Sequence, residues 1–361
     1  MAPVKAAVTA STPDRNTSSV PPHEPPPMDQ TDLDIVAALQ IAPRVPANAL
    51  ADILGEPAST ITRRLKRLQQ DRLMKVIGRF AWPLVTSGNP RQLWFKCQPG
   101  QALEVAEKLR GFREIQFLLV TSGSADIYAD LYPLHGSDIN ELLSRSVPSI
   151  PGVASIESQL VLESKRVGHS WRLDRLKPEQ VAALEVHRVP VNKPPMTSID
   201  ELSDIEFGTL LQLGQNARVT AAEVARSLNI SSSSAYRTIQ LLLNNGSISP
   251  RVEMEPAAAG FTLHAIISLQ VKPKFIAAAL ENLSVKKSAR MVSMVTGKAS
   301  IIYHGTFRGP DELAHFITDE IGALSGIQSI DTCVGLNVLR RYWMDRDGEL
   351  MGDQVEGLLT R

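Results

Sequence analysis

The feature that most constrains the fold of this chain is an internal repeat. Similar residues recur at a constant offset of 174 positions, as from Leu54 to Leu228, and the alignment needs no gap. Self-similarity at a fixed period indicates that one structural unit occurs more than once. We therefore predict two copies, at roughly 29–170 and 203–344, joined by the Pro-rich segment HRVPVNKPPMTS. Further matches at this offset are Ser59 and Ser233, Arg63 and Arg237, Gly123 and Gly297, and Gly152 and Gly326.

Length and composition indicate a soluble globular protein with two to three domains. The 361 residues are 43% hydrophobic and 21% charged, and the formal net charge is zero. Attraction to nucleic acid must therefore come from local patches of charge. The two cysteines, Cys97 and Cys333, are far apart and form neither a disulfide framework nor a metal-ligand spacing. We expect a cytoplasmic protein without a metal or a cofactor.

The first 28 residues contain no apolar core of the length that a signal peptide or a membrane span requires. They include the segment PPHEPPP. Prolines at this density favour an extended polyproline conformation. We expect a disordered arm over residues 1–28.

Residues 46–79 predict a helix-turn-helix. Apolar residues recur at helical spacing on both sides of Gly55-Glu56-Pro57. Glycine suits the left-handed residue that ends a helix, and proline prevents the helix from continuing. The first helix thus ends at a sharp turn, and a second helix is predicted over residues 58–70.

The predicted second helix carries four cations on its polar faces, with no carboxylate before Asp71. Arg and Lys hold phosphates and read guanine edges, and Ser and Thr reach either group. We interpret this helix as a DNA-recognition helix followed by a β wing at Leu73–Phe80; an ordinary solvated cationic face is the alternative. The candidate DNA contacts are Ser59, Thr60, Thr62, Arg63, Arg64, Lys66 and Arg67, with Ser233, Tyr236 and Arg237 in the second copy.

Each helix-turn-helix is followed by a pattern of strands and helices in the order βαββαβ, which is the ferredoxin-like order. The predicted fold class is therefore α+β, with two copies of a winged helix-turn-helix followed by a ferredoxin-like module. The predicted segments are a first helix-turn-helix domain at 29–82, a first βαββαβ domain at 90–170, a linker at 186–200, a second helix-turn-helix domain at 201–256 and a second βαββαβ domain at 261–344.

This order of motifs resembles the Lrp/AsnC family of transcription regulators. The resemblance rests on LADILGEPASTITRRLKRLQQDRLMKV, VTSGSADIYADL and IPGVASIESQLVLE in the first copy. In the second copy it rests on VARSLNISSSSAYRTIQLLLNNGSIS, VTGKASIIYHGTF and LSGIQSIDTCVGLN. The family implies a tandem regulator that binds double-stranded operator DNA and responds to an amino acid or a small carboxylate.

The family also implies that the effector binds near the turn after the second strand of each βαββαβ module. Glycine in these turns permits close approach of a ligand, and hydroxyl and N–H groups can hold a carboxylate; a plain hairpin turn is the alternative. Asp126 could accept from an α-ammonium group, whereas the second copy has Ser300 there. The candidate effector residues are Ser122, Gly123, Ser124, Asp126, Thr296, Gly297, Lys298 and Ser300.

Pairing of the two βαββαβ modules inside one chain is a further prediction, with residues 92–165 against 265–340. The resemblance then implies a homo-oligomer, either a dimer or a tetramer of tandem chains. The second copy carries only one cation in its recognition helix, so it could be a weaker DNA reader or a structural half. We expect no membrane association and no enzyme activity.

An enzyme of the siroheme decarboxylase type is the alternative function, because such enzymes look like the same architecture and also occur as fused pairs. The histidines considered for that role show no HNYxR-like cluster, and the sequence contains no nucleotide-binding loop or catalytic Ser-His-Asp order. A metabolite sensor without DNA binding is a third interpretation. The histidines are His135, His169, His264, His304 and His315.

Overall fold

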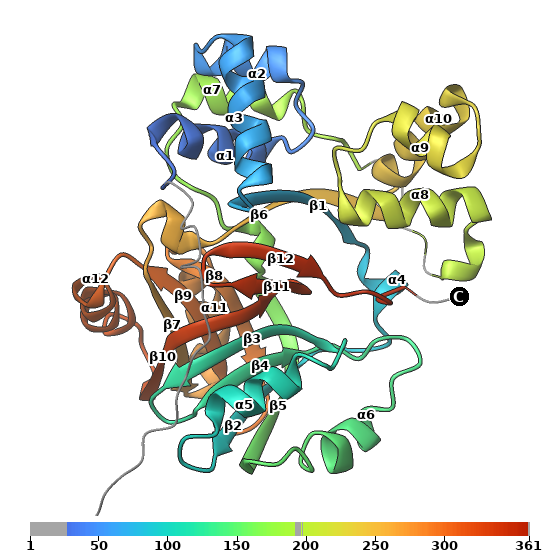
Figure 1. Cartoon of the computed structure of the whole chain (residues 1–361). Coiled ribbons are helices and arrows are strands. Elements are labelled where there is room, and N and C mark those ends of the chain that lie inside the picture. Colours follow the sequence, from blue (N-terminus) through green and yellow to red (C-terminus); the bar gives the residue numbers. More distant parts are fainter. Residues whose placement is uncertain (1–26, 192–195, 197, 360–361) are drawn as a thin grey trace, which may run out of the picture.

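The computed structural model describes residues 27–191, 196 and 198–359. Two helical units lie on the same side of a larger body of strands and helices (Figure 1). The mixed content of helices and strands agrees with the predicted α+β class. Most of the predicted arm, at residues 1–26, and part of the predicted linker, at 192–195 and 197, lie outside the described residues.

The two helical units have matching elements at the offset of 174 positions. In the first unit, α2 ends at Gly55 with φ of 72°, the left-handed conformation that the sequence predicted. Asp29 and Asp32 form a reciprocal capping box at the start of the first helix. The recognition helix has the predicted bounds. The units consist of α1 (Gln30–Ile41), α2 (Ala47–Leu54) and α3 (Ala58–Gln70), and of α8 (Asp204–Gln215), α9 (Ala221–Leu228) and α10 (Ser232–Asn244).

The predicted β wing of the first unit is a strand, and its partner lies in the second half of the chain. Strand β1 (Met74–Phe80) pairs antiparallel with β6 (Ile248–Met254) of the second half of the chain. The two strands form a separate two-stranded sheet, which we call the ribbon. Each strand therefore satisfies its backbone hydrogen bonds with its counterpart, and the ribbon lies between the helical units (Figure 1).

Reciprocal arginines also join the two helical units. Arg44 donates to the carbonyl oxygens of Ala217 and Val219. Arg218 donates in return to the carbonyl oxygens of Pro43 and Val45, at 2.7 and 3.0 Å. Because Arg218 lies 174 positions after Arg44, this contact has the form of a two-fold interface.

The body contains two βαββαβ segments. The strands and helices follow one another in the predicted order, and the second helix of each segment continues into a π-helical turn. The first segment consists of β2 (Arg91–Cys97), α5 (Ala102–Leu109), β3 (Ile115–Ser122), β4 (Ile127–Leu131), α6 (Ile139–Glu141), η1 (Leu142–Ser146) and β5 (Val153–Arg166). The second consists of β7 (Leu263–Val271), α11 (Ile276–Ser284), β8 (Ala289–Val295), β9 (Ile301–Phe307), α12 (Pro310–His315), η6 (Phe316–Ile321) and β10 (Ile327–Arg341).

The strands of the two segments pair with one another and close into a ring. Strand β5 pairs with β8, and β10 pairs with both β3 and β7, so that β10, β3, β4, β2, β5, β8, β9 and β7 follow one another around it. Pairing of the two modules within one chain is thereby confirmed. The ring leaves an inward face on each strand, because side chains alternate between the two faces.

The inward and outward faces are both buried. Outward side chains pack under α5 in the first segment and under α11 and α12 in the second. Inward side chains fill the middle of the ring with a separate cluster that includes Phe117, Tyr128, Ile266 and Ile302. Space remains toward the two ends of the ring interior, and these ends form the pockets described below.

Four further elements were not predicted. Helix α7 (Pro178–Glu185) packs on α1 and α2, and Trp171 joins the same core, so this stretch belongs to the first helical unit. Short helix α4 (Trp82–Val85) follows the ribbon. Strands β11 (Met344–Asp347) and β12 (Leu350–Gln354) extend the sheet beyond β10.

Arg72 takes the left-handed conformation that Gly246 takes in the second half, with φ of 58° and 70° respectively. Its carbonyl oxygen accepts from the N–H of Met351, and its Nε donates to the carbonyl of Met351 at 2.7 Å. These bonds to β12 hold a conformation that is unfavourable for a residue with a side chain. None of the described helices is long and apolar enough to cross a membrane.

Candidate DNA interface and small-molecule sites

Two of the four cations on the recognition helix are held by carboxylates. Asp32 of α1 is fully buried and pairs with both Arg64 and Arg67. Arg64 also pairs with Asp29 at 2.6 Å, and these bonds raise the pKa of its guanidinium. The expectation that no carboxylate offsets the cations of this helix is therefore wrong for Arg64 and Arg67. The helix packs against α1, which carries acidic residues in its first turn.

The other face of α3 stays open to solvent. Arg63 and Lys66 are exposed, and no ion pair to either is present in the described part of the chain. Ser59 and Thr62 are exposed beside them, while Thr60 is half-buried. Thr62 donates to the carbonyl of Ala58 within the helix. A polar surface with two free cations remains.

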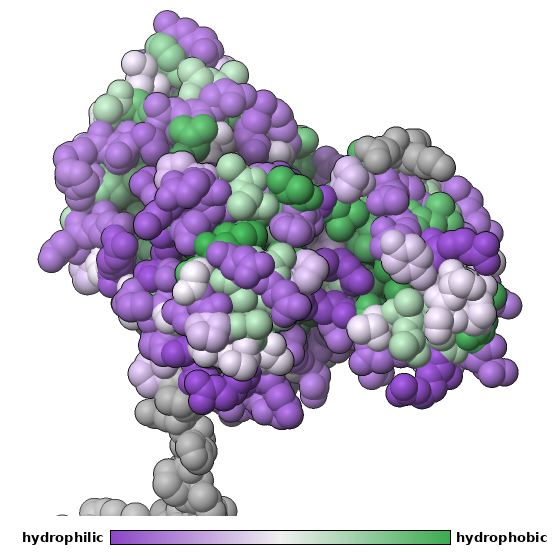
Figure 2. Space-filling view, turned by 90° about the horizontal axis from the view of Figure 1, so that it is seen from above, coloured by the Kyte–Doolittle hydropathy of each residue, from purple (hydrophilic) through white to green (hydrophobic). Residues whose placement is uncertain are grey.

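The equivalent surface of α10 is less basic. Ser233 and Arg237 are exposed, and Tyr236 is 58% exposed. Ser231 caps the helix by accepting from the N–H of Ser234. Seen from above, hydrophilic side chains cover much of the face that both helical units present, with smaller apolar patches between them (Figure 2).

The predicted effector turns of the two segments approach one groove, which we call the outer groove. Its volume is about 500 Å³, and Ser124 and Lys298 from the two turns both line it. An adjoining groove is lined by these two residues and Gly297. Lys298 pairs with Glu157 at 3.0 Å, and Ser124 hydrogen-bonds Asp331. Trp94 also lines the outer groove, and its indole N–H has no partner among the described residues.

The other predicted effector residues serve the backbone or lie outside both grooves. Asp126 accepts from the N–H of Cys97 at 2.8 Å, and Ser300 bonds the equivalent backbone at Val271. The expected role of Asp126 in holding an ammonium group thus competes with a structural bond. Thr296 accepts from the N–H of Leu160, Ser122 is exposed, and Gly123 has φ of 133° in the turn.

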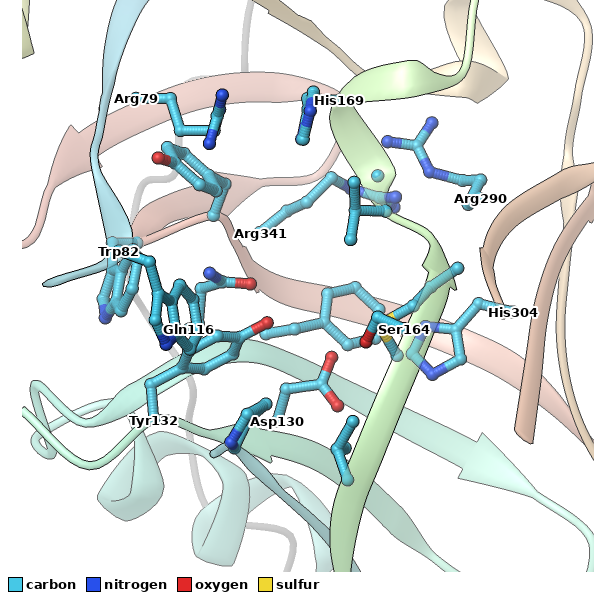
Figure 3. A pocket seen from close by; sticks show the side chains of 18 of the residues that line it. Arg79, Trp82, Gln116, Asp130, Tyr132, Ser164, His169, Arg290, His304 and Arg341 are labelled. Carbon is cyan, nitrogen blue, oxygen red and sulfur yellow. The ribbon is translucent and has the colours of Figure 1, made fainter. Parts of the chain in front are cut away.

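A second site, which we call the central cavity, lies at the opposite end of the ring interior. Its volume is about 160 Å³, and the ribbon contributes Arg79, Phe80 and Arg251 to its wall. Strands of the ring contribute eight polar side chains, and Tyr132 and His169 outside the strands also line the cavity; Figure 3 shows Gln116, Asp130 and Arg290 around the common space. The strand residues with polar side chains are Gln92, Gln116, Asp130, Ser164, His264, Arg290, His304 and Arg341.

Ion pairs behind the wall fix part of this charge. Arg341 bonds Glu255 and also meets Nε2 of His264 at 2.8 Å. Arg251 pairs with Glu253, and its guanidinium lies 4.0 Å from the centroid of the Tyr342 ring. Fully buried Arg346 bridges Glu253 and Glu255. These pairs immobilise the cationic side of the cavity.

Burial shifts the pKa values of two groups at equivalent positions of the two segments. Burial raises the pKa of Asp130 to about 7, and the hydrogen bond from Tyr128 Oη, at 2.6 Å, opposes this rise. Burial lowers the pKa of His304 to about 3, and Arg341 and Arg290 lower it further. His304 Nε2 meets Tyr128 Oη at 2.9 Å. Near neutral pH, His304 is therefore neutral and Asp130 titrates.

Sequence reasoning missed the central cavity, because its residues come from ten separate segments and form no local motif. One signal was available in the repeat. Asp130 corresponds to His304, and Gln116 corresponds to Arg290, at the offset of 174 positions. Residues of different charge at equivalent inward positions indicate a site where the two halves of the chain differ in chemistry.

Comparisons with known proteins relate parts of the chain to transcription regulators and most of its fold to that of a siroheme decarboxylase. Residues 28–69 match the AsnC-type helix-turn-helix domain. An uncharacterised HTH-type transcriptional regulator of Pyrococcus furiosus is 26% identical over 134 residues, which span 37% of this chain and 90% of that protein. The HTH-type transcriptional regulator LrpA of Pyrococcus abyssi is 26% identical over 144 residues, 38% of this chain and 97% of LrpA. The crystal structure of the siroheme decarboxylase NirDL with an iron-uroporphyrin III analogue has a TM-score of 0.56 at 12% identity, covering 85% of this chain and 92% of that one. The chain thus contains an AsnC-type helix-turn-helix, and its architecture extends to a fold shared with NirDL.

Proposed function

We propose that this protein is a DNA-binding transcription regulator of the Lrp/AsnC type, with two copies of the regulator in one chain. The observation that carries the proposal is the exposed pair Arg63 and Lys66 on the second helix of an AsnC-type helix-turn-helix. A recognition helix contacts bases and phosphates with such side chains in the major groove. Ser59 flanks the pair and can donate to phosphates or base edges, and the Thr62 hydroxyl, which donates to Ala58, can accept from a base edge.

The ion pairs of α3 refine which residues bind DNA. Arg64 and Arg67 hold the helix against Asp32, so their role is to position it, whereas Arg63 and Lys66 are free to neutralise phosphates. In the second half, Arg237 is the corresponding cation, with Ser233 and Tyr236 beside it. The first helical unit should therefore supply most of the electrostatic affinity.

Binding to DNA from the upstream region of its own gene tests this proposal, with affinity measured over a series of salt concentrations. Each lost phosphate contact lowers the slope of log affinity against log salt by about 0.9. The double change Arg63→Ala and Lys66→Ala should therefore weaken binding strongly and flatten the slope by about 1.8. Arg237→Ala should weaken it less. Arg145 is an exposed cation far from α3, so Arg145→Ala is the matched control. Unchanged affinity in the double variant would contradict the assignment.

The outer groove is the proposed effector site. It offers a cation in Lys298, carboxylates in Glu157 and Asp331, and the unpaired indole N–H of Trp94. This mixture suits the two charges of an amino acid. A ligand that binds only the folded protein raises its melting temperature, so a thermal-shift screen of amino acids and small carboxylates tests the site. Replacing Lys298, which lines the groove, with Gln should remove the shift; a shift that persists would place the ligand elsewhere.

Association of chains into a dimer or a tetramer belongs to the same proposal. The two βαββαβ segments already pair inside one chain, so fewer chains are needed to build a given assembly. Mass measurement in solution tests it, and a strict monomer at all concentrations would refute it.

A second candidate is an enzyme that acts on an iron tetrapyrrole. The fold similarity to NirDL over most of the chain and the histidines and arginines of the central cavity favour it. The volume of the central cavity, about 160 Å³, argues against this candidate. A cavity of about 150 Å³ holds a single benzene ring, and a tetrapyrrole is much larger. Mixing the protein with siroheme decides the point: a shifted absorption spectrum and a decarboxylated product would support the enzyme, and unchanged siroheme would exclude this activity.

A further inference from the structure

One end of the central cavity carries two arginines, Arg290 and Arg79, that are not directly paired with a carboxylate of the described residues. The Arg290 residue is 7% exposed, and its Nη1 has no hydrogen-bond partner in the described part of the chain. Its guanidinium lies 4.8 Å from the centroid of the Trp171 ring. No carboxylate of the described residues forms an ion pair with Arg290 or with Arg79. A buried cation without a partner is costly, so this end is suited to an anion.

The opposite end of the cavity is polar but not cationic. Figure 3 shows Asp130 and Tyr132 across the cavity from Arg79, His169 and Arg290. Gln92, beside Asp130 on the neighbouring strand, is fully buried, and neither its amide nitrogen nor its amide oxygen has a hydrogen-bond partner among the described residues. This end can therefore exchange hydrogen bonds with a neutral polar group.

The walls between the two ends are apolar and aromatic. Phe80, Phe117, Val161 and Trp343 line the space. Its volume of about 160 Å³ is close to that of a cavity that accepts one benzene ring, about 150 Å³. A guanidinium binds a carboxylate through parallel N–H donors, which a point charge does not offer. The complementary molecule is flat, has one ring and carries a carboxylate.

We propose that the central cavity binds a one-ring carboxylic acid that carries a polar group opposite its carboxylate. The carboxylate meets Arg290 and Arg79, and the polar group meets Gln92 and Asp130. This site is distinct from the outer groove, which lies at the other end of the ring. Because Arg79 belongs to the ribbon and Arg290 to the ring, the bound acid would join the two parts. The link to regulation rests on the proposed function, but the binding itself does not.

Calorimetric titration of the full chain without DNA tests the binding. The probes are benzoate, 4-hydroxybenzoate and nicotinate, with 4-hydroxybenzamide as a neutral counterpart. We expect at least one of the acids to bind with a Kd of about 1 mM or below and the amide to bind at least ten times more weakly. If none of the three acids binds at that level, or if the amide binds equally well, the proposal is wrong.

Two variants and a control locate the site. Arg290→Gln should lower the affinity for the acids at least tenfold. The melting temperature of this variant without ligand should stay at or above that of the wild type, because an unpaired buried charge has been removed. Lys298→Gln in the outer groove should leave these affinities unchanged. If Arg290→Gln melts at a lower temperature, Gln92→Leu decides: it should remove any preference for 4-hydroxybenzoate over benzoate. Unchanged binding in a folded Arg290→Gln protein would overturn the proposal. Because the titration contains no DNA, a negative result would not bear on the DNA-binding proposal, which the salt series tests separately.

Discussion

Asp130 should make the folded protein less stable as the pH rises from about 4 to about 7. Its carboxyl is buried among the strands of the ring, and burial raises its pKa from 3.8 to about 7. Between these values the folded protein holds a proton that the unfolded chain has released. Raising the pH therefore favours the unfolded chain over this interval, and the effect stops once both states are ionised.

The size of the effect follows from the two pKa values. Each pH unit between them is worth about 1.4 kcal/mol, so the full interval from 3.8 to about 7 corresponds to roughly 4 kcal/mol. Asp130→Asn keeps the shape of the side chain and can still accept from Tyr128, but it cannot ionise. The free energy of unfolding of the variant, relative to wild type, should thus rise by up to roughly 4 kcal/mol between pH 4 and pH 8.

Urea unfolding at several pH values, followed by tryptophan fluorescence, measures this difference. Trp94 is a suitable reporter because its ring lies 4.7 Å from that of Tyr128 inside the strand ring. The buried histidines act in the opposite direction: the low pKa of His304, about 3, makes the wild type more stable as the pH rises toward 6.5. Both proteins contain these histidines. Subtracting the free energy of unfolding of the wild type from that of the variant therefore leaves the contribution of Asp130.

A flat difference between pH 4 and pH 8 would refute the reasoning, since Asp130 would then ionise equally in both states. A second variant checks the cause. The hydrogen bond from Tyr128 lowers the pKa of Asp130, so the upper end of the rise should move to higher pH when Asp130→Asn is compared with Asp130 in a Tyr128→Phe background. A move to lower pH would contradict the assigned role of this hydrogen bond.

Three further changes test the packing of the fold. Arg346→Leu leaves two buried carboxylates without their shared cation, so it should cost about 3–5 kcal/mol of stability in urea unfolding; a loss below 1 kcal/mol would mean that the pairs are solvated. Gly78→Ala should cost about 1–3 kcal/mol and separate the ribbon from α8, because the new Cβ would lie 2.6 Å from the Leu213 carbonyl oxygen; an unchanged melting temperature would show that the ribbon yields freely. Arg44→Ala with Arg218→Ala removes the reciprocal bonds between the helical units and should speed backbone hydrogen exchange at Ala217 and Val219; exchange equal to wild type would argue that these arginines do not hold the units together.

Local patterns predicted most of the secondary structure. The recognition helix begins at Ala58 and ends at Gln70 as expected, because Gly55 and Pro57 determine the turn before it. The strands and helices of the two βαββαβ segments also follow the predicted order. These features depend on neighbours in the sequence, which a pattern can show.

Features that depend on distant residues were not predictable in the same way. The wing strand β1 pairs with β6 of the second half of the chain, and its own sequence does not show which strand it pairs with. Asp32 neutralises Arg64 and Arg67 from a different helix, and helical periodicity does not reveal which helix faces which. The central cavity combines side chains from many segments, and only the packing of the ring brings them together.

The differences between equivalent positions give the central cavity a direction. In a symmetric pair of segments, a cavity on the two-fold axis would present the same groups from both sides, so a ligand could bind in two equal orientations. Here Gln116 faces the cavity at the position equivalent to Arg290, and Asp130 at the position equivalent to His304. Cationic and neutral polar groups consequently lie at opposite ends (Figure 3). Because both segments belong to one chain, the residues at equivalent positions can differ from each other. A ligand with two chemically different ends can then bind in a single orientation.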